Sequence, residues 1–576
     1  MAAFLLVANT EKEFKVLQAL EVIRLQCSTL HKEFVLPGYR LYLFPKQIPG
    51  YQNHIVKPDS SIFFTGSPFI PGKPVSALKS GNFTPSDLSG MYFILKSDGF
   101  RLKFSIDESG LYSIYHSSSG SVISSSFLAL CTGLSGLTVD RDAAVENLLT
   151  GTLIGPETIF KEIKRFESSA PFTFKNLTFE PVISRRFKTY SIRNRKDSLV
   201  AQIDSLDAWF DGFRPVASEL GVSAGITGGL DSRLLLALCK RHLDHDKVRF
   251  HSHLRKSQDK DYLFGKAVCE KAGLQFKTVP VTDAFDISDD NSAAVFNEGM
   301  LFNDGQVRTH SFWFEEFNTS RYARLIMGDK LMGINGIGGE QYRNMERLLL
   351  PWRNNHAWIY SDMIARISGT NGASRKLIND LNDKLTNKIE LRLGPATKGR
   401  IDLLYIKRFM NEVYNPANRA LRACHENKQS YFLSPFAESA LSFTAYDAVG
   451  HLGSSINYEA EMIRMIDPDV ASVGSVYGFS FNKKEPLMSS LPRVIINNFT
   501  PGALGTRMLA AYGTGRTTRW TDIQNSNQYF SRCVNAIRDI SLPVNTDKLL
   551  GRTDIGPLVF AMGHLLISFG NKIKGQ

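Results

Sequence analysis

The chain has 576 residues, of which 43% are hydrophobic and 22% charged, and its formal net charge is +12. This composition is typical of a folded globular protein and excludes a largely disordered or collagen-like chain. The length predicts two or three domains, because domains usually hold about 100–200 residues. Its basic residues are dispersed and form no recognisable nucleic-acid module. We therefore expect a solvated basic surface and no nucleic-acid partner, with an anionic or nucleotide-bearing partner as the alternative.

The first segment, residues 2–8, is apolar but far shorter than the roughly 18 residues of a membrane span, and it lacks the basic start of a signal peptide. We expect it to form a β-strand, and we expect no transmembrane segment. The six cysteines contain no C-x-x-C pair, which argues against a disulfide framework or a zinc site. A cytoplasmic location is the resulting expectation.

The first part of the chain is rich in strand-like runs. Examples are residues 40–44, 90–96 and 110–116, which Gly, Pro, Ser and Asp turns separate. The pattern predicts an α+β or β-sandwich domain. It ends near 185–196, where the sequence turns basic and polar, and a helix is predicted at 198–213 by its apolar spacing.

We therefore assign residues 1–187 to a front domain and residues 188–576 to a second domain. The second domain begins with an alternation of strands and helices, which predicts a parallel α/β sheet. The predicted strands are 221–226, 248–253 and 275–281, and the predicted helices are 232–240 and 262–272. Beyond about residue 348 helical stretches dominate, such as 379–393 and 403–414, and we expect them to form an extension packed on the sheet.

The most informative motif is residues 223–233, Ser-Ala-Gly-Ile-Thr-Gly-Gly-Leu-Asp-Ser-Arg, which we place between a strand and a helix. Such a turn exposes backbone N–H groups and hydroxyls at the positive end of a helix, which suits a pyrophosphate. Asp231 adds a carboxylate of the kind that holds Mg²⁺. The alternative is a tight turn with Asp231 as an ordinary N-cap, but the complete string favours phosphate binding. Neither a Walker A loop nor G-x-G-x-x-G is present, which argues against kinase-type and dinucleotide chemistry.

The string at 227–232 resembles the PP-loop of ATP pyrophosphatases, the adenine nucleotide alpha hydrolase-like fold. More narrowly, it resembles the synthetase domain of the class B asparagine synthetase superfamily. Three further segments agree with that family in order: the helix at 261–274, Asn-Gly-Ile-Gly-Gly-Glu at 335–340, and Ser-Pro-Phe-Ala-Glu at 434–438. In the front domain, 88–93 and the segments that follow it resemble the family's glutaminase domain. The resemblance implies an α+β Ntn-hydrolase-like domain, then an α/β PP-loop domain with a helical C-terminal extension.

The resemblance also implies which residues bind ATP and Mg²⁺. Those expected at the nucleotide are Ile226, Thr227, Gly228, Gly229, Asp231, Ser232, Ser252, Asn335 and Gly336. Asp231 and Glu340 match the family's two magnesium carboxylates. Lys483 and Lys484 lie near the position of its catalytic lysine, with an exposed lysine pair as the alternative.

The chain departs from the family at its beginning. Glutamine-dependent members start with Met-Cys, and that cysteine attacks the amide of glutamine. Here Ala2 stands in its place, and the first cysteine is Cys27. We therefore expect a front domain without glutaminase activity.

A second departure is Ile337, which stands where asparagine synthetases have Glu and β-lactam synthetases have Tyr. An isoleucine cannot transfer a proton. Asp304, Glu298 and His310 are candidate replacement bases, with an ordinary loop or surface role as the alternative for each.

The sequence thus predicts an ATP-dependent, amide-forming ligase of the asparagine synthetase type. It would adenylate a carboxylate of a small molecule, peptide or sugar, release AMP and pyrophosphate, and use ammonia or a substrate amine, as β-lactam synthetases and lasso-peptide cyclases do. The alternative is a catalytically silent homologue that binds nucleotide or a protein partner, and a homodimer is left open. Sulfur transfer to tRNA is disfavoured, because Cys239 stands alone on its predicted helix.

Overall fold

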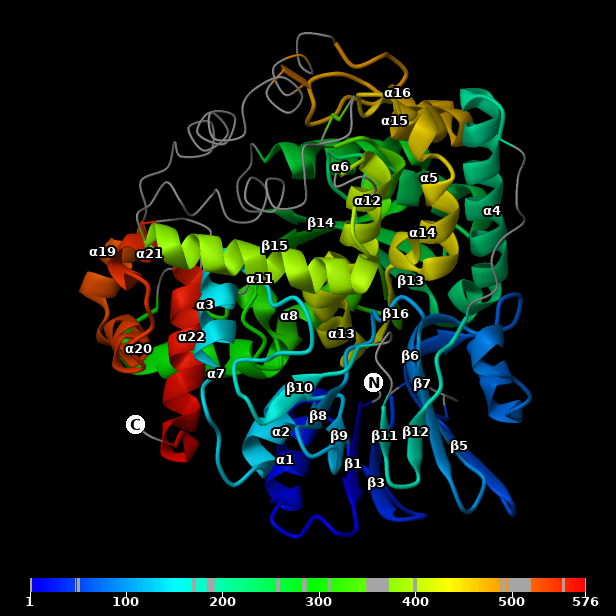
Figure 1. Ribbon diagram of the computed structural model, residues 1–576. Coiled ribbons are helices and arrows are strands. Elements are labelled where there is room, and N and C mark those ends of the chain that lie inside the picture. The colour runs from blue at the N-terminus through cyan, green and yellow to red at the C-terminus, as the bar shows by residue number, and fades with distance from the viewer. Residues whose placement is uncertain are drawn as a thin grey trace.

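The computed structural model has a mixed α/β fold with three sheets (Figure 1). The described residues are 3–46, 48, 52–167, 172–183, 192–254, 259–281, 287–308, 312–345, 347–348, 372–396, 401–486, 491, 494–495, 519–551 and 555–574. The predicted domain boundary at residue 187, together with Ala2 and His310, lies outside them.

Two six-stranded sheets form the front region, with the orders β10-β8-β9-β1-β3-β2 and β11-β12-β7-β6-β5-β4. Every strand pair is antiparallel except β7 with β12. The strands are β1 (Ala3–Ala8), β2 (Lys32–Leu36), β3 (Tyr39–Phe44), β4 (His54–Lys57), β5 (Ser60–Phe69), β6 (Ser89–Ser97), β7 (Leu102–Ile106), β8 (Tyr115–Ser117), β9 (Val122–Ser124), β10 (Ile163–Arg165), β11 (Thr173–Phe174) and β12 (Leu177–Phe179).

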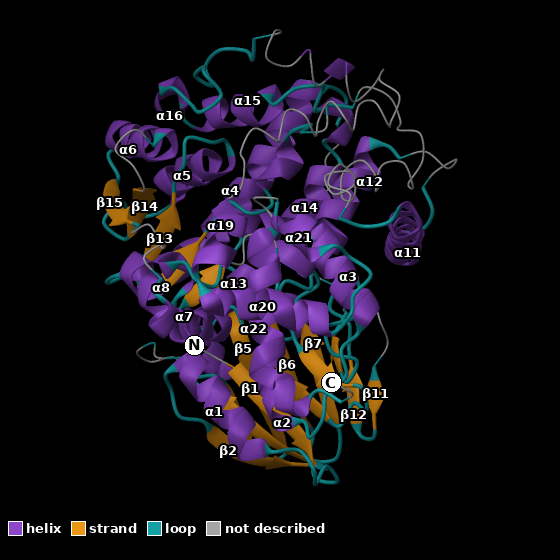
Figure 2. Cartoon of the chain, turned by 90° about the vertical axis from the view of Figure 1, so that its left-hand side faces the viewer, coloured by secondary structure: helices purple, strands orange, loops and turns teal. Residues whose placement is uncertain are grey.

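These two sheets pack face to face, because alternate side chains of each point to a shared apolar layer. Phe4 and Phe93 stack across it with ring centroids 4.1 Å apart. Helices α1 (Val16–Cys27) and α2 (Phe127–Gly133) cover the outer face of the first sheet (Figure 2). The outer face of the second sheet packs on α4 (Arg195–Leu220).

The predicted strands at 2–8, 40–44 and 90–96 are confirmed as β1, β3 and β6 over their described residues. The predicted strand at 110–116 is wrong over most of its length, since only β8 begins at its end. The buried carboxylate of Asp107 explains the difference. It accepts hydrogen bonds from the N–H groups of Leu111 and Tyr112, each at 2.9 Å, and so holds this segment in a turn.

The third sheet is entirely parallel, with the order β15-β14-β13-β16-β17. Its strands and first helices are β13 (Val222–Gly225), α5 (Asp231–His242), β14 (Val248–Leu254), α6 (Lys260–Ala272), β15 (Gln275–Pro280), β16 (Met332–Ile334) and β17 (Tyr431–Leu433). The predicted alternation of strands and helices is therefore confirmed. The chain builds outward from β13 in one direction and then from β16 in the other, and such a switch point opens a crevice at the carboxyl ends of the strands.

The remaining helices surround these sheets. They are α3 (Arg141–Thr150), α7 (Asp289–Phe302), α8 (Ser320–Met327), α11 (Arg375–Leu393), α12 (Leu403–Arg408), a π-helix (Phe409–Arg419), α13 (Ala420–Asn427), α14 (Ser439–Tyr446), α15 (Asn457–Ile466), α16 (Pro468–Ser472), α19 (Arg519–Ser526), α20 (Gln528–Asp539), α21 (Thr546–Leu550) and α22 (Gly556–Phe569). Short 3₁₀ helices lie at Val75–Ser80, Pro85–Asp87, Glu316–Asn318, Gly339–Tyr342, Pro435–Ala437, Val449–His451 and Gly570–Lys572.

The expected packing of the helical extension on the parallel sheet is correct for only part of it. Apolar faces of α14, α15 and α16 share a core with that sheet. Helices α11, α20 and α22 instead share a core with α1, α2 and α3 of the front region, so the end of the chain returns to its beginning (Figure 1). Phe569 of α22 meets Phe160 there with ring centroids 6.1 Å apart. No described helix has the length and apolar character that crossing a membrane requires.

Candidate functional site

The candidate site is the crevice where the loop after β13 meets the loop after β16. These strands are neighbours and parallel, so their following loops lie side by side. A Cβ atom added to Gly336 would lie 3.1 Å from Cβ of Asp231, and one added to Gly339 would lie 2.5 Å from its Oδ1. The second loop therefore needs glycine at 339 to approach Asp231 this closely.

The glycine loop, residues 226–232, is shaped by side chains that accept from its backbone. The N–H of Gly229 donates to Oγ1 of Thr227 at 3.2 Å, the N–H of Gly228 to Oδ1 of Asp261 at 3.0 Å, and the N–H of Thr227 to Oγ of Ser232 at 3.1 Å. The hydroxyls of Thr227 and Ser232 lie 3.0 Å apart, and Thr227 is exposed. Helix α5 begins at Asp231, and the first N–H groups of a helix lack partners within it. These three loop N–H groups are therefore already bonded, contrary to the expectation that the turn exposes them, and an anion here would meet the two hydroxyls and the start of α5.

A covering segment, residues 473–481, lies against this loop. The buried guanidinium of Arg233 donates to the carbonyl oxygens of Val473 and Gly474, at 2.7 Å each, and its carbon lies 4.6 Å from the ring centre of Phe481. The N–H of Val476 donates to the carbonyl of Gly228 at 3.2 Å. Burial lowers the pKa of Arg233 to about 10. In the sequence Arg233 is the last residue of the motif at 223–233, and no neighbouring residue indicates that it bonds the covering segment.

Both predicted magnesium carboxylates lie in the crevice, and each has an arginine partner. Nη1 and Nη2 of Arg343 donate to the two oxygens of Asp231 at 2.5 and 3.0 Å. Arg343 also pairs with Glu459, and Arg419 pairs with Glu340. Burial raises the pKa of the fully buried Glu459 well above its usual value, although Arg343 opposes this shift.

These arginines and Glu459 were missed by sequence reasoning. Arg343 bonds Asp231 across 112 residues and Glu459 across 116. No spacing rule connects positions so far apart in the chain. The one available signal is that Arg343 follows the matched loop by three residues.

Of the other residues predicted to bind the nucleotide, Ile226 and Asn335 directly follow β13 and β16, and Ser252 lies in the neighbouring strand β14. The N–H of Ile226 donates to the carbonyl of His251 at 2.9 Å, which places Ser252 of β14 level with the start of the glycine loop. Ser252 is buried. Oδ1 of Asn335 accepts from the N–H of Ile337 at 3.1 Å, so this amide shapes its own loop.

Lys483 and Lys484 are both exposed, directly after the covering segment. The side chain of the neighbouring Glu485 is held by Arg347, with oxygens 2.6 and 3.1 Å from its nitrogens. No ion pair of either lysine is found among the described residues. The two lysines therefore follow the covering segment closely in the chain, and their side chains are exposed to solvent.

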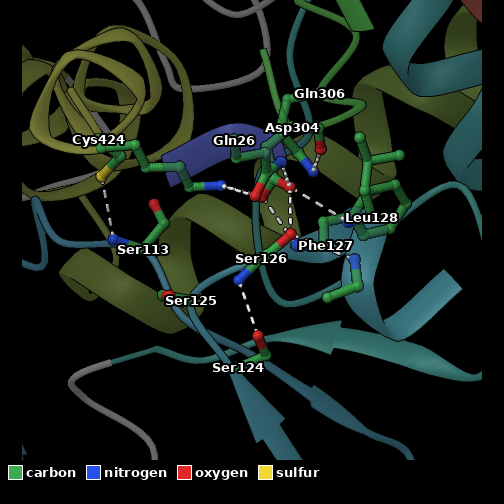
Figure 3. Close-up of polar contacts among 12 residues, drawn as sticks. Gln26, Ser113, Ser124, Ser125, Ser126, Phe127, Leu128, Asp304, Gln306 and Cys424 are labelled. Carbon is green, nitrogen blue, oxygen red and sulfur yellow. Dashed lines mark hydrogen bonds and ion pairs between the residues drawn. The ribbon is translucent and has the colours of Figure 1, made fainter. Parts of the chain in front are cut away.

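The candidate bases and Ile337 are placed elsewhere. Ile337 packs against the apolar layer of the front region. Asp304 is buried and accepts from Oγ of Ser126 at 2.6 Å and from the N–H of Phe127 at 2.8 Å, while Nζ of Lys428 lies 3.1 Å away (Figure 3). It therefore caps α2 and joins the two regions, and all its contacts lie outside the crevice. Glu298 is exposed on α7.

The donor chemistry of Asp231 and Glu340 fits a magnesium ion that arrives with phosphates. Mg²⁺ commonly takes one or two carboxylates together with phosphate oxygens. Among the described residues no group of three or more His, Cys, Asp or Glu side chains is arranged for a metal. Arg343 and Arg419 compete with the ion for the same oxygens.

The chain matches no family model and no curated protein. A functional proposal therefore depends on the crevice itself and on the resemblance of its loops.

Proposed function

We propose that this protein is an ATP-dependent ligase that adenylates a carboxylate and joins it to ammonia or a substrate amine, releasing AMP and pyrophosphate. The observation that carries the proposal is the meeting of the glycine loop and the loop after β16 at Asp231, at the switch point of a parallel sheet. The turn at 434–438 adds support. Nε2 of Gln341 donates to the carbonyl of Phe436 at 2.7 Å, and Asp261 accepts from the N–H of Gly228, so the four resembling segments of the second region adjoin one another.

In this proposal the front region is an Ntn-hydrolase-like domain without glutaminase activity, and the second is a PP-loop domain. The substrate acid is a small molecule, peptide or sugar carboxylate. The reaction takes place in the cytoplasm, without a nucleic-acid partner, and a homodimer is left open.

The glycine loop and the start of α5 bind the β- and γ-phosphates, which leaves the α-phosphorus open to attack. A carboxylate oxygen forms a bond to this phosphorus as the bond to the bridging oxygen breaks, and the electron pair leaves with pyrophosphate. The amine nitrogen then forms a bond to the carbonyl carbon, and AMP leaves. Ile337 cannot take the amine proton, so it passes to AMP or to water.

Asp231 and Glu340 would hold Mg²⁺, which when bound neutralises charge on the departing pyrophosphate. The side chain of Arg419 is 35% exposed, whereas the side chain of Arg343 is only 6% exposed. Arg419 is therefore the arginine that can turn from its carboxylate towards phosphate. Arg343 stays fixed and holds Asp231 in position.

The proposal is tested by exchange of labelled pyrophosphate into ATP. The protein is incubated with ATP, Mg²⁺ and sets of small-molecule, peptide and sugar acids, and an acid that is adenylated should start the exchange without any amine. Adding ammonia or an amine should then give AMP as the nucleotide product. ADP as the sole product would contradict adenylation. Glutamine should yield no glutamate.

A second candidate is a silent homologue that binds nucleotide without turnover. The observation in its favour is that both predicted metal carboxylates are already paired with arginines. This candidate predicts that ATP binds equally well with Mg²⁺ and with excess EDTA, and that no acid starts the exchange. Tighter binding with Mg²⁺ would count against it.

A further inference from the structure

A cavity of about 530 Å³ is lined by residues of the second sheet of the front region, of α4 and of the beginning of α14. Its volume is in the usual range of small-molecule sites. Its walls combine aromatic rings with acids: Phe69, Phe83, Tyr92 and Trp209, and Asp87, Asp107, Glu108 and Glu438. Lys73 is the only basic side chain among the described residues that line it. On a chain of net charge +12, this cavity is a local acidic site.

Glu438 is one of the buried polar residues that line this cavity, with 5% of its surface exposed. One carboxyl oxygen, Oε2, accepts from Nε1 of Trp209 and from the N–H of Gly90, each at 3.2 Å. The other, Oε1, is buried and has no hydrogen-bond partner within the described part of the chain. Such an atom is costly unless something outside the chain bonds it.

The charged groups around Glu438 indicate which charge such a partner would carry. Burial raises the pKa of Glu438 to about 8, and the nearby Asp107 adds to this shift. Burial also raises the pKa of Asp107 to about 6, against the opposing hydrogen bonds of backbone N–H groups. Asp87 and Glu108 add further acid to the walls, and Lys73 adds one cation. A ligand that carries positive charge would relieve this excess and restore the carboxylate.

We propose that this cavity binds a small organic ammonium ion, with its charged nitrogen at the acidic wall that holds Glu438 and its carbon atoms against the wall that holds Trp209 and Phe69. Aromatic faces attract cations, and the attraction grows where water is excluded. Trp209 and Phe69 are nearly fully buried and meet edge to face at 5.8 Å, so they form a fixed wall. No glycine-loop residue lines this cavity, although Glu438 ends the 434–438 turn beside the loop after β16, and ammonium binding can be measured without adenylation.

The test uses the full chain and three matched probes: butylammonium, butanol and butyrate. Ligand-observed saturation-transfer NMR should detect butylammonium alone. Because the carboxylate is the binding form, affinity should rise about tenfold or more between pH 6.5 and 8.5, where the amine stays charged. Equal binding of butanol, or ammonium binding that does not change over this range, would overturn the proposal. So would displacement of butylammonium by equimolar potassium chloride, which would indicate an inorganic cation site.

Glu438→Gln supplies the matched variant, because glutamine has the size of the neutral acid that is present without ligand. It should fold as the parent does and lose butylammonium binding. Glu33→Gln makes the same change of net charge at an exposed position and should bind normally. Retained binding by Glu438→Gln would contradict the inference. Should that variant fail to fold, the pH dependence of the unaltered protein decides the question alone.

Discussion

The crevice and the acidic cavity each contain buried carboxylates, but the groups that bond these carboxylates differ between the two places. In the crevice the partly exposed Asp231 and the buried Glu340 each meet a guanidinium group. In the cavity the partners of Glu438 are neutral N–H groups, and burial raises its pKa to about 8. Glu459 in the crevice shows that burial and partner act together on a carboxyl group: burial raises its pKa well above the usual value, and Arg343 opposes that shift.

The largest effect should come from removing a crevice arginine. Arg343→Met leaves Asp231 and the buried Glu459 without a counter-charge, and we expect a loss of about 3–5 kcal/mol in the free energy of unfolding. Denaturant unfolding followed by tryptophan fluorescence measures it. Adding Glu459→Gln to this variant should recover part of the loss.

The matched control for that change is Arg40→Met, which removes an exposed arginine 3.4 Å from Glu33. Exposed pairs contribute about 0–1 kcal/mol, so a small loss is expected. Similar losses in the two variants would mean that burial adds nothing to the Arg343 pairs, and the comparison above would fail.

The next effect concerns turnover. Asp231→Asn should lower acid-dependent pyrophosphate exchange by about 10²–10³, because it removes a carboxylate aimed at the reacting phosphates. The fold should survive, since Arg343 keeps Glu459 as its ionic partner. Normal exchange by a folded Asp231→Asn protein would make the glycine loop a structural turn.

A smaller effect should appear in the pH dependence of stability. The folded pKa of Glu438, about 8, lies above its usual value of 4.5. Its stabilising contribution is therefore complete below about pH 4.5 and is lost as pH rises through 8. Between pH 6.5 and 8.5 the unaltered protein should lose about 2 kcal/mol relative to Glu438→Gln. Unfolding midpoints of both proteins across this range check the prediction, and a constant difference would contradict it.

The smallest effect is expected at the exposed lysines beside the crevice. The double change Lys483→Ala and Lys484→Ala should alter the free energy of unfolding by no more than about 0.5 kcal/mol, because exposed charges without close partners contribute little. A thermal melt measures it. A loss above 1 kcal/mol would show that these side chains are held in place.

Local pattern was sufficient to predict β13, the glycine turn and α5, because these are consecutive and their signals lie within about 20 residues. The partners of Glu438 in the acidic cavity could not be predicted in this way. Trp209 reaches Glu438 across 229 residues, and Gly90 reaches it across 348. Such pairings depend on how whole sheets and helices pack. Asp304 shows the same limit, because a carboxylate that the sequence offers as a base is the cap of a helix 178 residues earlier.

That cap has a consequence for synthesis on the ribosome. The start of α2 obtains its carboxylate only after 178 further residues have been added, which at about 5–20 residues per second takes roughly 9–36 s. Until then the N–H groups of Phe127 and Leu128 have only water to bond. The start of α2 therefore completes its hydrogen bonds only after Asp304 has been made. A nascent chain that stops before Asp304 therefore lacks the carboxylate that accepts from the first N–H groups of α2.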